Sequence, residues 1–129
     1  MKTISRSILV VLMAMLVTMG YSHQQQRMSA EDRAKSTTEW MTKELKLDDK
    51  TSKKVEEINL KFAKKTQEKM MEARDAGIDR SQMREMMGKV NDEKNKELKP
   101  VLGDEKYEQY LKLLEERRQN RQAGQQGGR

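Results

Sequence analysis

Apolar and polar residues alternate with the period of an α-helix along most of the chain after residue 28. The clearest stretch is residues 47–74, which contains neither Gly nor Pro. About one apolar or small residue falls in each helical turn on one side of it, and Lys, Glu, Gln and Asn fill most other positions. That side consists of Val55, Ile58, Phe62, Ala63, Thr66 and Met70. The pattern predicts one long amphipathic helix that organises the rest of the chain.

Residues that cap helices divide the chain into four predicted helices. Ser29 precedes a weaker amphipathic stretch that runs to about residue 46. Asp48 is a suitable N-cap for the long helix, and Gly77 is a suitable C′ residue at its end. Asp79 and Gln82 have the spacing of a capping box, so we expect a third helix to start at residue 80.

Pro100 and Gly103 separate the third predicted helix from the fourth. Pro100 lacks a backbone N–H, so we expect it to stop or kink the third helix. After Gly103, apolar residues at positions i, i+3, i+4 and i+7 predict a last helix: Tyr107, Tyr110, Leu111 and Leu114. Residues 117–129 have no apolar period, and we predict that they form a flexible tail.

The short link at residues 77–79 predicts that the second and third helices form an antiparallel hairpin. No stretch has the alternation or the composition of a β-strand. The sequence therefore predicts an all-α domain of four helices over residues 29–116.

Residues 1–22 have the pattern of a cleaved signal peptide. Lys2 and Arg6 precede an apolar run over residues 8–19, and Gly20 and Ser22 supply small residues near the cleavage point. The run is too short to cross a membrane, which takes about 20 apolar residues. An uncleaved interfacial anchor is the alternative. We expect export to the periplasm, with a disordered segment at residues 23–28.

Charge and cysteine content narrow the range of partners. The net charge of +6 would fall to +4 on removal of Lys2 and Arg6, and acidic and basic residues are interspersed. A nucleic-acid-binding protein would be expected to show a basic stripe with aromatic residues, so no nucleic acid is predicted. The chain has no Cys and only 34% apolar residues. Its core must therefore be thin, which favours a dimer that buries more apolar surface.

The chain carries few residues suited to catalysis. Its one histidine, His23, lies in the predicted disordered segment, and cysteine is absent. Carboxylates are many, but each has a basic residue nearby and a surface position in a predicted helix. No Gly-rich phosphate loop and no zinc-type ligand set is present. We therefore predict neither an enzyme nor a cofactor or metal requirement.

Methionines gather around the predicted hairpin, at Met70, Met71, Met83, Met86 and Met87. Three interpretations fit them. They can form the apolar face of the helices, they can form an adaptable surface for varied apolar partners, or their thioethers can bind Cu(I). The lysines and arginines between them supply either ordinary solubilising charge or attraction for acidic and unfolded chains.

Two short segments, LDDKT at residues 47–51 and LGDEK at residues 102–106, resemble the paired L-T-x-x-Q motifs of the Spy/CpxP family of exported helical proteins. Neither copy keeps the Thr or the Gln of the motif. The resemblance covers about residues 29–114, and its motif positions correspond to Leu47, Asp48, Thr51, Leu102, Gly103 and Lys106.

The resemblance implies a thin cradle formed by an antiparallel homodimer. It also implies an ATP-independent periplasmic chaperone that binds unfolded or partly folded envelope proteins, or a regulatory partner of an envelope sensor kinase. We expect the end of the long helix at Val55 and Ile58 to be structural and the hairpin end to be functional. The candidate client-binding residues are Phe62, Lys64, Lys65, Met70, Met71, Arg74, Arg80, Met83, Arg84, Met86 and Met87.

Overall fold

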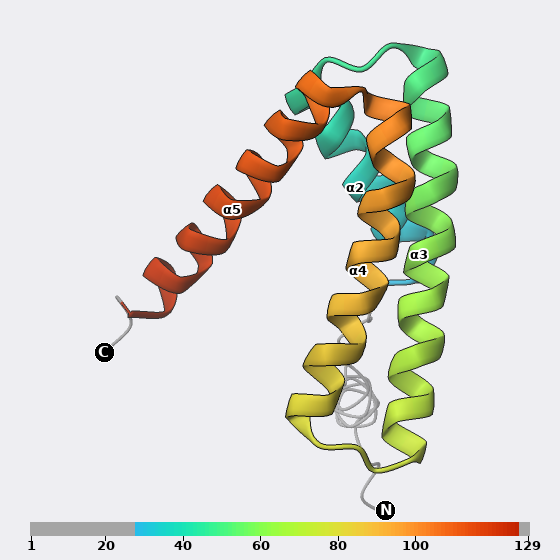
Figure 1. The fold of residues 1–129 in the computed structure, drawn as a ribbon, viewed down its shortest axis with the longest axis vertical. Helices are drawn as coiled ribbons and strands as arrows, with labels where there is room; N and C mark the ends of the chain where they lie inside the picture. Colours follow the sequence, from blue (N-terminus) through green and yellow to red (C-terminus); the bar gives the residue numbers. More distant parts are fainter. Residues whose placement is uncertain (1–27, 127–129) are drawn as a thin grey trace, which may run out of the picture.

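The computed structural model describes residues 28–126; the expected signal peptide and most of the segment at residues 23–28 lie outside this range. The described residues form four α-helices and no strand, which confirms the all-α prediction (Figure 1). The helices are α2 (Ala30–Leu45), α3 (Asp49–Asp75), α4 (Arg80–Leu102) and α5 (Asp104–Gln126). Within residues 28–126, no helix combines the length and apolar character that a membrane crossing requires.

Three helices begin at the residues that the sequence indicated. The Ser29 side chain accepts a hydrogen bond from the Asp32 backbone N–H at 3.0 Å at the start of α2. The Asp48 carboxylate accepts one from the Thr51 N–H at 2.7 Å at the start of α3. Asp79 and Gln82 form the full capping box at the start of α4. These contacts satisfy backbone donors that have no partner inside the helix.

Helices α3 and α4 run antiparallel side by side, and α2 packs against α3 (Figure 1). Gly77, at φ 64°, occupies the left-handed conformation that closes the end of α3 before the turn into α4. Helix α5 starts beside the end of α4 and then diverges from the other three helices (Figure 1). The hairpin therefore has an enclosed end near α5 and a tip at the turn between α3 and α4.

The main core lies at the enclosed end, where α2, the end of α4 and the start of α5 meet α3. We call it the base core, and it consists of the buried residues Met41, Leu45, Leu47, Val55, Leu98, Leu102 and Tyr110. Trp40, Ile58, Val101, Tyr107 and Leu113 are partly buried against it. Val55 and Ile58 thus have the structural position that the sequence predicted for them.

The two motif-like segments meet in the base core. Leu47 and Leu102 belong to the same buried cluster although they are far apart in the sequence. The Lys106 ammonium donates a hydrogen bond to the Lys46 carbonyl oxygen at 3.3 Å. Hydrogen bonds from Thr51 lower the pKa of Asp48, and the charges of Lys106 and Lys50 lower it further. The repeated leucine therefore marks two helix boundaries that pack on each other.

The boundary between α4 and α5 lies at Gly103, and Pro100 lies inside the last turn of α4. Pro100 was expected to stop or kink the helix, yet the helix ends two residues beyond it. Gly103 has φ 78° and ψ 162°, a backbone conformation that is almost exclusive to glycine. A threonine at this position would be strained, which accounts for the glycine in the second motif-like segment.

The C-terminal segment corrects the prediction of a flexible tail at residues 117–129. Helix α5 continues to Gln126, and only residues 127–129 lie outside the described part. The Arg117 guanidinium lies 4.4 Å from the centre of the Trp40 ring, which fixes one turn of this segment on α2. Further along, Gln119 donates to Glu115 at 3.2 Å, one turn earlier. Local side-chain pairs and good helix formers therefore extend the helix where no apolar period exists.

Candidate functional site

An open groove with a volume of about 420 Å³ lies between the start of α2 and the tip half of the hairpin. Methionine side chains form much of its lining, and three of them are strongly exposed: Met28 at 52%, Met70 at 46% and Met71 at 55%. We call this the methionine groove. Its lining residues are Met28, Ser29, Arg33, Gln67, Met70, Met71, Arg74 and Met83.

The lengths of the helices explain why these methionines remain exposed. Helix α3 has 27 residues and α2 has 16, so α2 cannot cover α3 along its whole length. Towards the tip, α3 buries the small residue Ala73, whereas Met70 and Met71 lie outside this buried position. The apolar pattern of α3 therefore continues beyond the point where it is fully covered.

The groove brings together four of the predicted site residues, Met70, Met71, Arg74 and Met83. Four others lie elsewhere on α4: Met86 and Met87 are half-buried, and Arg80 and Arg84 are exposed. The groove also includes Met28 and Arg33, which the sequence-based set of site residues omitted. Met28 directly precedes the N-cap Ser29, a position where an apolar residue often packs on the first turns of a helix. This rule could have indicated from the sequence that Met28 lies against the start of α2.

Phe62 corrects the predicted set of site residues. Its side chain is only 3% exposed, so it contributes to packing between the helices and is not available to a client protein. Its position seven residues after Val55 places both residues on the buried side of α3. An aromatic residue on the buried side of α3 therefore stabilises the packing between helices.

Lys64 and Lys65 lie outside the methionine groove, and both form ion pairs with neighbouring helices. Lys64 lies 3.5 Å from Glu31 of α2, and Lys65 pairs with Glu93 of α4. The hydrogen bond from Lys65 lowers the pKa of Glu93. These two lysines therefore connect neighbouring helices, and the positive charge of the methionine groove comes from Arg33 and Arg74.

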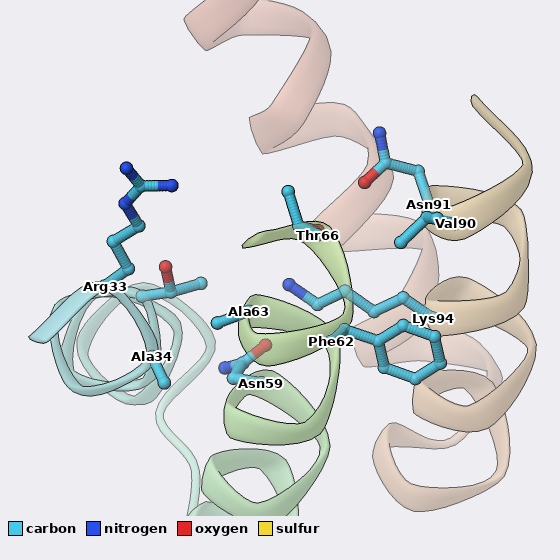
Figure 2. Close-up of a pocket in the computed structure, with 10 residues that line it drawn as sticks. Arg33, Ala34, Asn59, Phe62, Ala63, Thr66, Val90, Asn91 and Lys94 are labelled. Carbon is cyan, nitrogen blue, oxygen red and sulfur yellow. The ribbon is translucent and has the colours of Figure 1, made fainter. Parts of the chain in front are cut away.

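A second, smaller site lies between α2, α3 and α4 and has a volume of about 160 Å³ (Figure 2). We call it the polar pocket. Polar and apolar residues share its lining. Its lining residues are Arg33, Ala34, Thr37, Asn59, Phe62, Ala63, Thr66, Val90, Asn91 and Lys94.

Asn59 is the most deeply buried polar residue of this pocket, at 2% exposure. Its amide nitrogen donates to the Thr38 hydroxyl at 3.0 Å and to the Met41 sulfur at 3.6 Å. The Thr38 hydroxyl in turn donates to the Ala34 carbonyl oxygen at 2.8 Å. The side-chain oxygen of Asn59 has no hydrogen-bond partner among the described residues. A buried acceptor without a partner is costly, by about 1–3 kcal/mol.

Lys94 is the second unusual group of the polar pocket. Figure 2 shows its side chain reaching from α4 toward α3, with the amine between the helices. Burial lowers the pKa of this amine, because the charged form loses hydration. Within residues 28–126, no carboxylate lies within ion-pair distance of Lys94 or of Arg33. The pocket therefore holds two basic groups without a counter-ion.

Among the described residues, no group of three or more His, Cys, Asp or Glu side chains is arranged to hold a metal ion. His23 lies outside the described range. The candidate sites of this part of the chain are therefore the methionine groove and the polar pocket.

Comparison with known protein families assigns the chain to one family. The family model described as "Domain of unknown function (DUF4890)" matches residues 20–110. The chain belongs to this family. The match includes α2, α3, α4 and the start of α5, and so contains every lining residue of the methionine groove and of the polar pocket. No curated protein and no solved structure matches the chain.

Proposed function

We propose that this protein is an exported, ATP-independent chaperone of the periplasm that holds apolar segments of unfolded or partly folded envelope proteins in the methionine groove. The observation that carries the proposal is the groove itself, in which Met28, Met70 and Met71 leave about half of their side-chain surface exposed. A contiguous exposed apolar patch on a soluble protein is typical of an interaction site. The resemblance to the Spy/CpxP family agrees with this role.

The residue types of the groove suit partners of varied sequence. Methionine is unbranched and polarisable, so Met70, Met71 and Met83 can adjust their rotamers to different apolar side chains. Arg33 and Arg74 add positive charge at the same surface, which attracts acidic segments from a distance. The same two arginines disfavour a bound Cu(I) ion, so the groove supports protein binding better than copper binding.

In this proposal, the protein acts as a homodimer. Helix α5 leaves Leu111 and Leu114 exposed where it diverges from the other helices. A second copy that covers this apolar surface would enlarge the thin core of a single chain. The antiparallel cradle implied by the Spy/CpxP resemblance is the arrangement that we propose.

An aggregation assay tests the proposed function. The purified protein is expected to suppress the aggregation of a chemically unfolded client, without ATP, at nearly equal molar amounts. The double variant Met70→Gln/Met71→Gln is expected to lose most of this suppression, because both side chains become polar. Met70→Leu/Met71→Leu is the matched control, since it changes the same two positions but keeps them apolar, and it should retain most of the suppression. No suppression at severalfold excess would reject the proposal.

Regulation of an envelope sensor is the alternative function, and the same protein preparations distinguish it. A regulator would bind one sensor domain with saturation and would have little effect on generic unfolded clients. That result would assign the methionine groove to a specific partner.

A further inference from the structure

The polar pocket combines two features that one ligand group could satisfy together. Arg33 and Lys94 are basic groups with no carboxylate partner among the described residues. The buried side-chain oxygen of Asn59 is a hydrogen-bond acceptor without a donor. A ligand that fits must therefore present a negative charge and, close to it, a hydrogen-bond donor such as a peptide N–H group. A fully deprotonated phosphate has only acceptors and would leave Asn59 unsatisfied.

The size of the pocket limits the ligand to a small group. Its volume of about 160 Å³ is close to that of an engineered protein cavity of about 150 Å³ that binds benzene, a molecule of six carbon atoms. A carboxylate, its α-carbon and the adjacent amide nitrogen are a group of similar size. Ala34, Phe62 and Val90 provide apolar walls around that group.

Arg33 connects the polar pocket with the methionine groove, because it lines both. A peptide with apolar side chains in the groove therefore has a short path into the pocket. Arg33 of α2 and Lys94 of α4 both line the pocket, and Figure 2 shows the exposed Arg33 guanidinium extending away from the Lys94 amine, so Arg33 reaches a group beside Lys94 through a change of rotamer. A group between them would receive hydrogen bonds from two charged donors.

We propose that the polar pocket binds the C-terminal carboxylate of a client peptide, with Lys94 and Arg33 on the carboxylate and Asn59 accepting the N–H of the last residue. This assignment extends the proposed chaperone function, because it names the part of the client that the protein recognises. Bound carboxylate supplies the counter-charge that Lys94 lacks, and the peptide N–H supplies the donor that Asn59 lacks.

Peptide binding provides the test. A fluorescently labelled peptide of about eight apolar and polar residues is prepared with a free C-terminal acid and, separately, with a C-terminal amide. Fluorescence anisotropy should give a dissociation constant for the acid that is at least about tenfold lower than for the amide. Equal affinities for the acid and the amide would overturn the proposal.

Two variants show whether the preference arises in the pocket. Lys94→Met is expected to remove the preference for the acid, so that the acid and the amide bind this variant with equal affinity. Lys96→Met is the matched control, since Lys96 is exposed on the same helix, and it should keep the preference. If both variants lose the preference equally, general surface charge is responsible and the pocket assignment is wrong.

Small anions separate the terminus of a peptide from other sources of negative charge. N-acetyl-leucine should compete with the labelled acid only at much higher concentration, because it cannot occupy the methionine groove. Inorganic sulfate, an anion with hydrogen-bond acceptors only, should not compete at similar concentration and ionic strength. Equally strong competition by sulfate would overturn the assignment to a peptide terminus. Equally strong competition by N-acetyl-leucine would overturn the part of the proposal that places the rest of the peptide in the methionine groove.

The aggregation assay fails or succeeds independently of this result. A long unfolded client offers many apolar segments to the methionine groove, so suppression of its aggregation does not require a free C-terminus in the polar pocket. If the unmodified protein suppresses aggregation but binds the acid and the amide equally, only the pocket assignment is rejected. If the unmodified protein prefers the acid but does not suppress aggregation, only the chaperone function is rejected.

Discussion

At its base, the α3–α4 hairpin is enclosed by α2 and α5, whereas towards its tip, within residues 28–126, only the start of α2 lies beside it (Figure 1). The same residue type occurs in both regions. Met41 is fully buried in the base core, and Met71 is 55% exposed in the methionine groove. The sequence of α3 has a similar amphipathic pattern throughout, so the number of covering helices decides which apolar residues are buried.

This difference assigns separate roles to the two regions. The base core gathers residues from all four helices and fixes the start of α3 and the end of α4. The tip gains little stability from apolar burial, because its large apolar side chains remain partly exposed. A rigid base can therefore hold an open apolar surface at the tip.

The strongest test of the comparison replaces a methionine in each region. Met41→Ala should lower the free energy of unfolding by about 2–5 kcal/mol, because it removes a fully buried side chain and leaves a cavity. Met71→Ala should change it by no more than about 0.5 kcal/mol. Urea denaturation followed by circular dichroism measures both values. Similar losses in the two variants would show that the tip is covered in solution.

Glycine replacements provide the second test. Gly103→Ala at the base should destabilise the fold by about 1–3 kcal/mol, because Gly103 has a backbone conformation that alanine rarely adopts. No atom lies within 4 Å of the added methyl group, so the loss reflects backbone strain alone. Urea denaturation again provides the measurement.

Gly88→Ala, in the tip half of α4, is the matched control. This glycine is helical and also has open space around its added methyl group. The substitution should stabilise the protein by about 0.5–1 kcal/mol, because alanine favours the helix. Destabilisation by Gly88→Ala would indicate that this face of α4 is covered by another molecule.

Local rules explain why most of the fold could be predicted from the sequence. Ser29, Asp48 and Asp79 cap their helices through short-range contacts, which depend on only a few neighbouring residues. Gly77 closes α3 for the same reason. The extension of α5 to Gln126 could not be read in this way, because it includes a contact between Arg117 and Trp40 of another helix.

The candidate sites were harder to predict, because they depend on contacts between helices. Lys65 on its own helix resembles a free surface charge, and only the packing of α4 brings Glu93 to it. Asn59 was assigned to the polar side of the long helix although it lies four residues after Val55 and three before Phe62. That spacing was the available sign that Asn59 is buried.

A third and smaller effect concerns Lys94, which lies between the two regions. Burial lowers the pKa of Lys94 below its usual value of 10.5, so the folded protein binds this proton less tightly than the unfolded chain does. The unmodified protein should therefore gain stability as the pH rises from the lowered pKa towards 10.5. Lys94→Met should be more stable than the unmodified protein at pH 7, and this advantage should shrink at pH 10.

Urea denaturation at both pH values measures this effect. Lys96→Met is the control, because its side chain is exposed and its replacement should not alter the pH dependence. An advantage of Lys94→Met that stays constant between pH 7 and pH 10 would contradict the account of Lys94 as a desolvated charge. The prediction also links stability to the polar pocket, since the same substitution should remove the preference for a peptide carboxylate.

The smallest expected effect comes from the ion pair between Lys61 and Glu97, whose charged atoms lie 2.5 Å apart across α3 and α4. Both side chains are largely exposed, so a double-mutant cycle with Lys61→Met and Glu97→Gln should give a coupling of about 0.2–1 kcal/mol. Salt at about 1 M should remove most of it, because the screening length is then only about 3 Å. A coupling as large as the loss in Met41→Ala would mean that charge pairs, rather than apolar burial, hold the two helices together. The contrast between the base core and the tip would then need an electrostatic explanation, because the lysines that pair with α4 extend along α3 from Lys61 to Lys65.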